Sequence, residues 1–221
     1  PKQKKRVLQA LAYEMMRRNL RNISPADAAD IIDPALKRVH PQTDSEEFLK
    51  MIANYSGFLV EHSPGIYSFA HLTFQEYLTA VFIKEQRLEQ VLLDQVENAW
   101  WHETIRLYAA QADATNLIRA CVMREPASIS ALTLAVECLD EALEVEDAFR
   151  KIPAELVRGI EDNNPEIRRI GAEVLLQLRL RKLVRLDETT YADRSLVTQA
   201  EYQLFLDEMR ENGRYCQPDH W

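Results

Sequence analysis

The stretch YSFAHLTFQEYLTA, residues 67–80, decides how the first part of this chain folds. It begins as a short strand, passes through His71, and continues with Thr73-Phe74-Gln75-Glu76, which has the pattern of a capping box at a helix start. In a capping box the threonine hydroxyl accepts from the glutamate N–H, and the glutamate side chain accepts from the threonine N–H. The sequence therefore predicts a helix capped by Thr73, with His71 held just ahead of it.

The residues before this stretch predict three helices. An apolar stripe marks the first over residues 4–21. Ser24 followed by Pro25 starts the second, which is expected to end near Val39. The pattern Thr43-Asp44-Ser45-Glu46 is a capping box for the third, which is expected to run to about Tyr55.

A hairpin is expected after these helices. Residues 58–62 and 66–70 are strand candidates, and Ser63-Pro64-Gly65 between them suits a tight turn. Three helices followed by a two-stranded wing is the order of elements in a winged helix.

Residues 88–182 indicate a succession of helices, with starts expected at Pro126, Pro153 and Pro165. The segments around Ala135 and Ala172 look alike, at an offset of 172 − 135 = 37 residues. This offset is close to the period of roughly 40 residues in HEAT-type helical pairs. Two similar segments are equally compatible with an irregular helical stack.

Composition narrows the class of protein. The chain has 221 residues with 47% hydrophobic and 28% charged side chains, as expected for a soluble globular protein of one or two domains. No apolar run is long enough for a transmembrane helix. The first residue is Pro1 rather than methionine, so we expect a fragment. The net charge of −8 disfavours a nucleic-acid-binding surface. Cys121, Cys138 and Cys216 lack metal-ligand spacing and are interpreted as buried free thiols in a reducing cytoplasm.

Residues 69–80, FAHLTFQEYLTA, resemble the Phe-x-His-x-(Ser/Thr)-Phe-Gln-Glu-(Tyr/Phe)-x-x-Ala motif of NACHT-type signal-transduction (STAND) NTPases. With the preceding helices and hairpin, the resemblance covers about residues 1–86. It implies that His71 contacts the β-phosphate of bound ADP and holds a closed resting state. A ring N–H beside a helix N-terminus suits an anion. The other interpretation of His71 is a partly buried residue that only bonds a backbone carbonyl.

The nucleotide-binding machinery of that family is absent from the sequence. It contains neither the Gly-x-x-x-x-Gly-Lys-(Ser/Thr) loop nor a Walker B acidic strand. We therefore expect no enzymatic activity and no bound cofactor in this fragment. The full-length protein is expected to be an ATPase that binds ADP or ATP with Mg²⁺.

Residues 183–221 resemble the start of a formylglycine-generating-enzyme-like (sulfatase-modifying factor) domain. The resemblance rests on LVTQAEYQLF, residues 196–205, and on Pro218-Asp219-His220-Trp221. The first of these includes a further capping box, Thr198-Gln199-Ala200-Glu201. The catalytic cysteines of that family lie further downstream, so Cys216 is interpreted as a bystander thiol. The resemblance implies a protein or small ligand at this module.

Three other groups of residues have side chains of the kinds found in functional sites. Glu61, His62 and His71 do not converge as metal ligands, because Glu61 and His62 point to opposite faces of a strand. Trp100 is expected to pack between helices, with His102 and Glu103 facing solvent. The acidic residues between Glu137 and Asp147 are interpreted as a solvated face, or alternatively as a contact for a basic partner.

The resulting hypothesis is a mainly α protein: a winged helix with a small hairpin over 1–86, a HEAT-like helical domain over 87–182, and the beginning of an α+β module over 183–221. The expected function is the regulatory and scaffold portion of a bacterial, cytoplasmic, nucleotide-dependent switch, with His71 as the nucleotide-sensing residue and no catalytic or metal site. Expected partners are an upstream NTPase domain, further copies of the protein on activation, and a ligand of the last module, but neither membrane nor nucleic acid. The alternative is a non-enzymatic helical adaptor without a nucleotide role.

Overall fold

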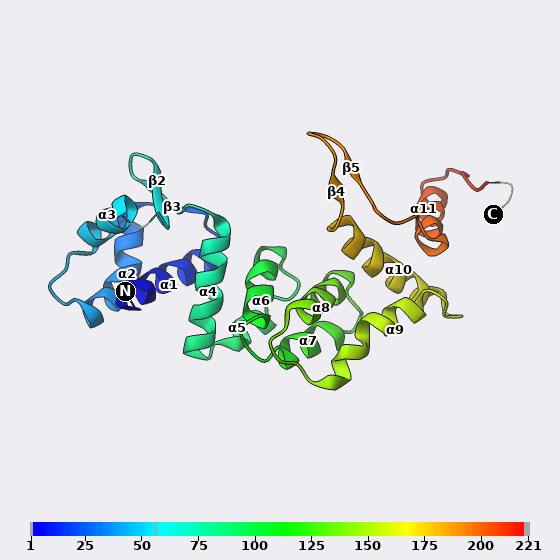
Figure 1. Ribbon diagram of the computed structural model, residues 1–221, viewed down its shortest axis with the longest axis horizontal. Coiled ribbons are helices and arrows are strands. Elements are labelled where there is room, and N and C mark those ends of the chain that lie inside the picture. The colour runs from blue at the N-terminus through cyan, green and yellow to red at the C-terminus, as the bar shows by residue number, and fades with distance from the viewer. Residues whose placement is uncertain (1, 56, 219–221) are drawn as a thin grey trace.

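The computed structural model describes residues 2–55 and 57–218. The fold is mainly α, with two small antiparallel sheets. Figure 1 shows the helices in an elongated row, with the N-terminal unit at one end and a hairpin and last helix at the other. Among the described residues, none of the helices has the combination of length and apolar character needed to cross a bilayer.

The N-terminal unit is a winged helix. Its helices are α1 (Lys2–Arg17), α2 (Pro25–Val39) and α3 (Ser45–Tyr55), and its sheet has the strand order β1-β3-β2, formed by β1 (Asn22–Ile23), β2 (Leu59–Ser63) and β3 (Ile66–Phe69). The predicted hairpin is confirmed, and Gly65 in its turn has a φ of +79°. The expected helix over 4–21 ends early, at Arg17, because Asn19 adopts a φ of 57°. The two-residue strand β1 was not predicted, because it is too short to show a period.

The N-caps of α2 and α3 can be compared with the predicted ones. Ser24 accepts from the Asp27 N–H at 3.1 Å, which confirms the start of α2. The predicted capping box beginning at Thr43 is wrong by one residue. Asp44 Oδ1 accepts from the Glu47 N–H at 2.9 Å, and α3 begins at Ser45. The Thr43 N–H instead donates to the His40 carbonyl at 3.1 Å in the preceding turn.

The helix α4 (Leu72–Gln86) joins the winged helix to the rest of the molecule, because it packs against both α1 and α6 (Figure 1). Leu78 lies in the core of the winged helix, whereas Ala80 and Ile83 lie in the next core. The neighbouring residues Met15 and Met16 of α1 divide in the same way between the two cores. A helix with apolar residues all round is buried on several sides. The winged helix and the helical region therefore share α4.

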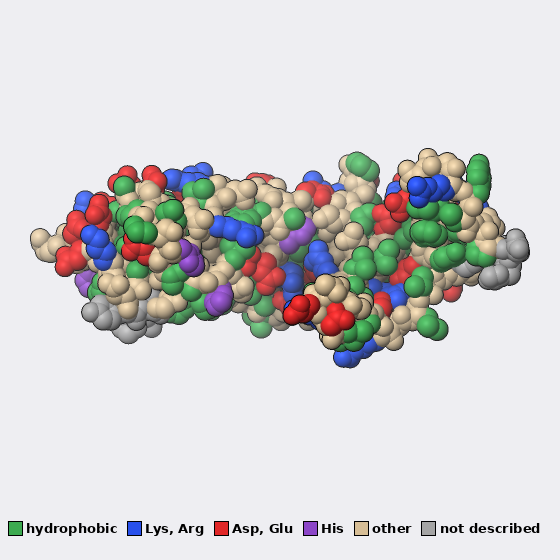
Figure 2. All heavy atoms as spheres, turned by 90° about the horizontal axis from the view of Figure 1, so that it is seen from above, with side chains coloured by type: hydrophobic (Ala, Val, Ile, Leu, Met, Phe, Trp, Pro, Cys, Tyr) green, Lys and Arg blue, Asp and Glu red, His purple; other side chains and the backbone are tan. Residues whose placement is uncertain are grey.

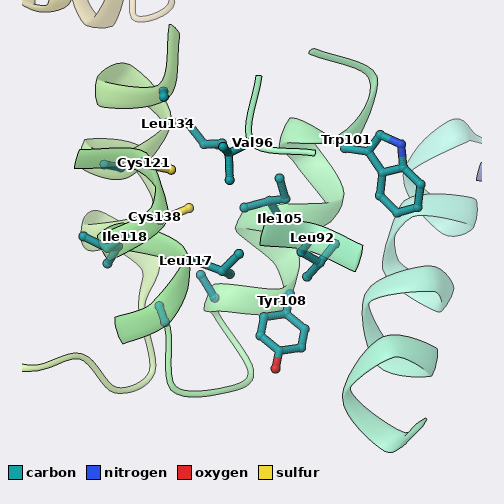
Figure 3. Packing of buried hydrophobic residues seen from close by; sticks show 14 of the residues in the cluster. Leu92, Val96, Trp101, Ile105, Tyr108, Leu117, Ile118, Cys121, Leu134 and Cys138 are labelled. Carbon is teal, nitrogen blue, oxygen red and sulfur yellow. The ribbon is translucent and has the colours of Figure 1, made fainter. Parts of the chain in front are cut away.

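The second core is built from short helices, and Figure 3 shows several of their side chains, such as Leu92, Ile105 and Leu117, in the space between them. The elements are α5 (Glu89–Leu93), η1 (Ala99–Trp101), α6 (His102–Ala109), α7 (Thr115–Val122), α8 (Ile129–Glu141), η2 (Asp147–Lys151), α9 (Ile152–Gly159) and α10 (Pro165–Leu180). The starts at Pro153 and Pro165 are confirmed, since each proline lies in the first turn of its helix. The start expected at Pro126 is wrong, because Ser128 caps α8 by accepting from the Ala131 N–H at 3.2 Å.

The two similar sequence segments lie in neighbouring helices. Ala135 in α8 and Ala172 in α10 are both buried, and α8 and α10 pack against each other. Next to Ala172, a Cβ on Gly171 would lie 3.0 Å from the Leu156 carbonyl oxygen of α9. The backbones of α9 and α10 therefore cross closely at a glycine, which has no Cβ to prevent it. This packing supports a repeat-like helical stack.

The last described segment contains a hairpin and one helix. The hairpin pairs β4 (Val184–Arg185) with β5 (Tyr191–Ala192), and α11 spans Gln199–Glu211. The predicted capping box of Thr198 and Glu201 is confirmed. The strand β5 was not predicted within this polar stretch; Asp187 Oδ1 forms the turn by accepting from the N–H groups of Thr189 and Thr190. Figure 2 shows hydrophobic side chains gathered on the surface at this end of the molecule.

Candidate functional site

The residue ahead of α4 is His71, and it is the N-cap of that helix. Its backbone is extended, with φ −134° and ψ 141°, and no side chain makes a capping hydrogen bond at this start. The preceding residue is held in the sheet, because the Ala70 N–H donates to the Phe58 carbonyl at 2.9 Å. The side chain of His71 is exposed. The end of the wing and the start of α4 thus fix the backbone of His71 and leave its ring accessible.

The imidazole ring packs against Phe74, which in turn packs against Phe58. The ring centroids of His71 and Phe74 lie 5.5 Å apart, edge to face, and those of Phe74 and Phe58 lie 5.2 Å apart. Edge-to-face contacts of this kind restrict ring orientation. Within the described part of the chain, the imidazole has no hydrogen-bond partner, so the alternative of a buried ring tied to a backbone carbonyl does not describe this geometry.

The predicted capping box of Thr73 and Glu76 is wrong. The N-cap is His71, two residues before the predicted cap Thr73, and the helix begins at Leu72; Thr73 is exposed while Glu76 is only 7% exposed. The reason is tertiary packing. The buried side chain of Gln75 donates to the Leu20 carbonyl at 3.0 Å, which ties the first turn of α4 to the end of α1. With this face turned inward, Glu76 points into the protein and does not reach back to the Thr73 N–H.

The start of α4 therefore presents a set of hydrogen-bond donors. In the first turn the Phe74 N–H donates to the His71 carbonyl at 3.0 Å, while the His71 side chain makes no capping bond, so the Leu72 and Thr73 N–H groups have no partner among the described residues. The side chains of His71 and Thr73, at the same helix start, are both exposed. Backbone N–H groups, the positive end of the helix dipole and a ring N–H all favour an anion such as phosphate.

Glu76 is the residue of this helix for which the prediction is wrong: it is buried and does not form the expected capping box. Burial, and secondarily the charge of Glu103, raises the pKa of its carboxyl to about 7, while Arg21 opposes the shift. The sequence held one usable signal: a helix whose remaining positions are mostly apolar leaves few faces on which a glutamate can reach solvent.

The other candidate residues do not form a site. Among the described residues, no three His, Cys, Asp or Glu side chains are grouped to hold a metal ion. Glu61 accepts from the Gly65 N–H at 2.7 Å and so closes the wing turn, while His62 is exposed. The expected burial of the cysteines is confirmed for Cys121 and Cys138 and wrong for Cys216, which is exposed; burial raises the pKa of Cys121 to about 12. Such a thiol is a poor nucleophile at neutral pH.

The expectation that His102 faces solvent is wrong. His102 is 7% exposed, and its Nε2 lies 3.1 Å from the Val96 carbonyl oxygen. Burial lowers its pKa, and the contact with Val96 opposes that shift. The neighbouring Trp100 does pack between helices, as expected, and its indole N–H donates to the Met16 carbonyl at 3.1 Å.

The acidic residues between Glu137 and Asp147 are mostly exposed, as a solvated face requires. Five of the six also pair with cations of the chain: Glu137 with Arg181, Asp140 with Lys182, Glu141 with Arg106, Glu146 with Arg119 and Asp147 with Arg150. A basic partner would therefore compete with these ion pairs at most positions.

Comparison with known proteins gives one result. Residues 1–83 match the family described as a winged helix-turn-helix domain C-terminal to NACHT. No curated protein and no solved structure matches the chain. The matched part ends within α4 and includes the wing, His71 and the first turns of that helix. The first part of this chain is thus a winged helix of the kind that follows a NACHT domain, and it implies association with such a domain.

Proposed function

We propose that this chain is the regulatory and scaffold portion of a nucleotide-dependent switch of the NACHT type. In this proposal an upstream NTPase domain binds ADP or ATP with Mg²⁺, and His71 contacts a phosphate of bound ADP. The complete protein would be a bacterial, cytoplasmic ATPase. This chain would supply the contact that keeps the ADP-bound resting state closed.

The observation that carries the proposal is the uncapped start of α4 with an exposed histidine as its N-cap. The phenylalanine support restricts the ring, so the imidazole, the first-turn N–H groups and the Thr73 hydroxyl form a preorganised half-site. Half of a site binds a phosphate weakly, because affinity requires donors on several sides of the anion. The proposed partner domain provides the other half.

The shared helix α4 suggests how the nucleotide state reaches the rest of the chain. His71 lies at its first end, and residues of the same helix lie in both cores. Near the other end, Lys84 Nζ donates to the Gln111 carbonyl at 2.5 Å. A displacement of the start of α4 would therefore move the winged helix and the second core together. Release of ADP would free this unit and expose surfaces for self-assembly.

The segment from Leu183 onward belongs to this proposal as the start of a formylglycine-generating-enzyme-like, ligand-binding module. The hairpin β4–β5 followed by the capped helix α11 supports it, since the resemblance implies a strand leading into this helix. Of the supporting Pro218-Asp219-His220-Trp221, the last three residues lie outside the described part of the chain. The ligand would be a protein or a small molecule.

The test uses the complete protein that contains the upstream NTPase domain. The variant His71→Ala is expected to release ADP faster than the wild type and to assemble without the activating signal. Fluorescently labelled ADP measures the first effect by stopped flow, and light scattering with size-exclusion chromatography measures the second. The matched control is His62→Ala, which removes an equally exposed histidine from the wing of the same domain.

The rival function is a helical protein-interaction adaptor with no nucleotide role. It predicts that His71→Ala retains ADP and stays in the same oligomeric state as the wild type. The proposal is abandoned if His71→Ala and His62→Ala behave alike in both measurements.

A further inference from the structure

A buried carboxyl lies where the winged helix meets the helical region. Glu76 is in the second turn of α4 and is 7% exposed. On this helix α1 packs from the side of the winged helix and α6 from the side of the second core. Within the described residues Glu76 has no hydrogen-bond partner, and its carboxyl oxygens are not among the completely enclosed unpartnered atoms, so they keep a small contact with solvent. Burial of a carboxylate without hydrogen bonds is costly, whereas burial of the neutral acid costs much less.

Two charged groups act on the charge of this carboxyl, and they belong to elements on the two sides of the junction. Arg21 follows α1, and its guanidinium lies 5.5 Å from the centre of the Trp100 ring. Glu103 belongs to α6 and accepts from Arg106 at 3.0 Å. Arg106 also pairs with Glu141 of α8. Glu103 opposes a negative charge on Glu76, and Arg21 favours it, so the two sides of the junction act in opposite directions.

Several other charged groups on the adjoining elements have contacts of their own. In α1, Glu14 pairs with both Arg17 and Arg18, Lys5 Nζ lies 5.9 Å from the centre of the Tyr77 ring, and Arg6 is exposed. In α5, Glu89 accepts from Asn116 at 3.1 Å. In α6, His102 contacts the Val96 carbonyl, and its lowered pKa keeps it neutral near neutral pH. The ionisation of Glu76 is therefore governed by its burial, by Glu103 and by Arg21.

We propose that Glu76 makes the junction between the winged helix and the helical region proton-sensitive: the neutral acid permits close packing of α4 on α1 and α6, and ionisation weakens that packing. The packed junction with the neutral acid and the loosened junction with the carboxylate differ by one proton, which passes between the carboxyl and water. This device is independent of a nucleotide and of His71.

The direction of the effect follows from the pKa. The carboxyl titrates near 7 in the packed junction, against 4.5 for an accessible glutamate. The packed state therefore holds a proton that the open state has lost, and its advantage declines as the pH rises from 4.5 through 7. Between pH 6 and pH 8 the equilibrium constant for opening is expected to rise by up to about tenfold.

Hydrogen–deuterium exchange of the whole chain tests this proposal. Backbone amides of α4 and α6 are compared at pH 6 and pH 8 after correction for the intrinsic exchange rate. The wild type is expected to lose protection in α4 and α6 at pH 8, while α2, which lies away from the junction, keeps it. Equal corrected protection at both values would overturn the proposal.

Two variants separate the carboxyl from other titrating groups. Glu76→Gln keeps the shape and removes the charge, so its protection is expected to be the same at pH 6 and pH 8. The control is Glu85→Gln, which changes an exposed glutamate on the same helix and should retain the wild-type pH dependence. A wild-type pH dependence in Glu76→Gln would assign the effect to another group. If that variant does not fold, the carboxyl resonance of Glu76 in the wild-type protein decides, and titration near 4.5 would contradict the proposal.

Discussion

Glu76 and Glu201 are two glutamates with nearly the same burial and opposite electrostatics. They are 7% and 6% exposed, and each stands three residues after a threonine near a helix start. Burial raises the pKa of Glu76 to about 7. Burial also acts on Glu201, but hydrogen bonds from the Thr198 backbone and hydroxyl and the contact with Arg179 outweigh it and lower the pKa. Partners, rather than exposure, decide whether a buried carboxyl keeps its charge.

The partners of Glu201 also hold the last segment against α10. Its Oε2 accepts from the Thr198 N–H at 2.7 Å and pairs with Arg179 of α10. Arg179 further pairs with Asp193 and donates to the Ser195 carbonyl at 3.2 Å. One guanidinium thus joins α10, the end of the hairpin and the start of α11. Glu76 lies at a junction too, but without a comparable partner.

The largest expected effect comes from removing the cation that distinguishes the two glutamates. Arg179→Ala leaves Glu201 buried without its ion pair, which destabilises the attachment of α11 by about 2 kcal/mol. This is less than for a fully buried pair, because the Arg179 side chain is 22% exposed. Hydrogen exchange of α11 amides is expected to become roughly thirtyfold faster.

The control for that experiment is Arg150→Ala. Arg150 pairs with Asp147, whose side chain is 99% exposed, so the loss of that pair should leave exchange in α11 unchanged. If Arg179→Ala protects α11 as well as the wild type does, the capping box alone holds this helix start.

The second prediction concerns how the stability of the fold depends on pH, on the acid side and near neutral pH. The neutral acid of Glu76 stabilises the fold below pH 4.5, and that contribution is lost as the pH rises through about 7. The lowered pKa of Glu201 acts in the other direction: its contribution is present above 4.5 and is lost as the pH falls through the lowered pKa. The lowered pKa of His102 adds a loss of stability below pH 6.5.

Thermal unfolding from pH 4 to pH 8.5 separates these two regions of pH. Glu76→Gln should remove about 1 to 2 kcal/mol of the decline between pH 5 and pH 8 and leave the acid side unchanged. Glu201→Gln should flatten only the acid side. A single variant that altered both regions would mean that the two sites are coupled.

The same contrast explains which features were predictable from sequence. The pattern Thr-x-x-Glu occurs at residues 73–76 and 198–201, and only the second forms a capping box. At α11 the local signal agrees with the packing, since the capping glutamate also meets Arg179. At α4 the Gln75 bond to Leu20 and the burial of Glu76 override it. Local patterns predict that a helix begins, but tertiary contacts choose the residue at which it begins.

The other predictions also divide into features set by the local sequence and features set by tertiary contacts. The winged-helix order, the hairpin and the helical succession were predictable, because each depends on hydrophobic period and turn chemistry. The strands β1 and β5 were not, because two residues show no period. The burial of His102 was not, because it depends on a carbonyl six residues earlier in a loop. The position of His71 beside the start of α4 was predictable. The contact of Phe58 with Phe74, the ring that packs against His71, was not, since it joins residues on either side of the wing.

The third prediction is a smaller effect at the two threonines. Thr198→Ala removes a cap that accepts from the Glu201 N–H at 3.3 Å, and it should cost about 1 kcal/mol of α11 stability. Thr73→Ala should cost only a few tenths of a kcal/mol, because Thr73 is exposed and makes no cap. Hydrogen exchange at the two helix starts measures both losses of stability. Equal losses would mean that Thr73 does cap α4.

The smallest effect distinguishes burial from charge at Glu76. Glu103→Gln removes the like charge, so the pKa of Glu76 should fall from about 7 but remain above 4.5, because burial is the larger cause of the shift. Arg21→Gln removes the favourable charge and should move the pKa upward. Titration of the Glu76 carboxyl resonance measures both changes. A return to 4.5 in Glu103→Gln would mean that repulsion, and not burial, sets the ionisation of Glu76, and the contrast with Glu201 would then be one between neighbouring charges alone.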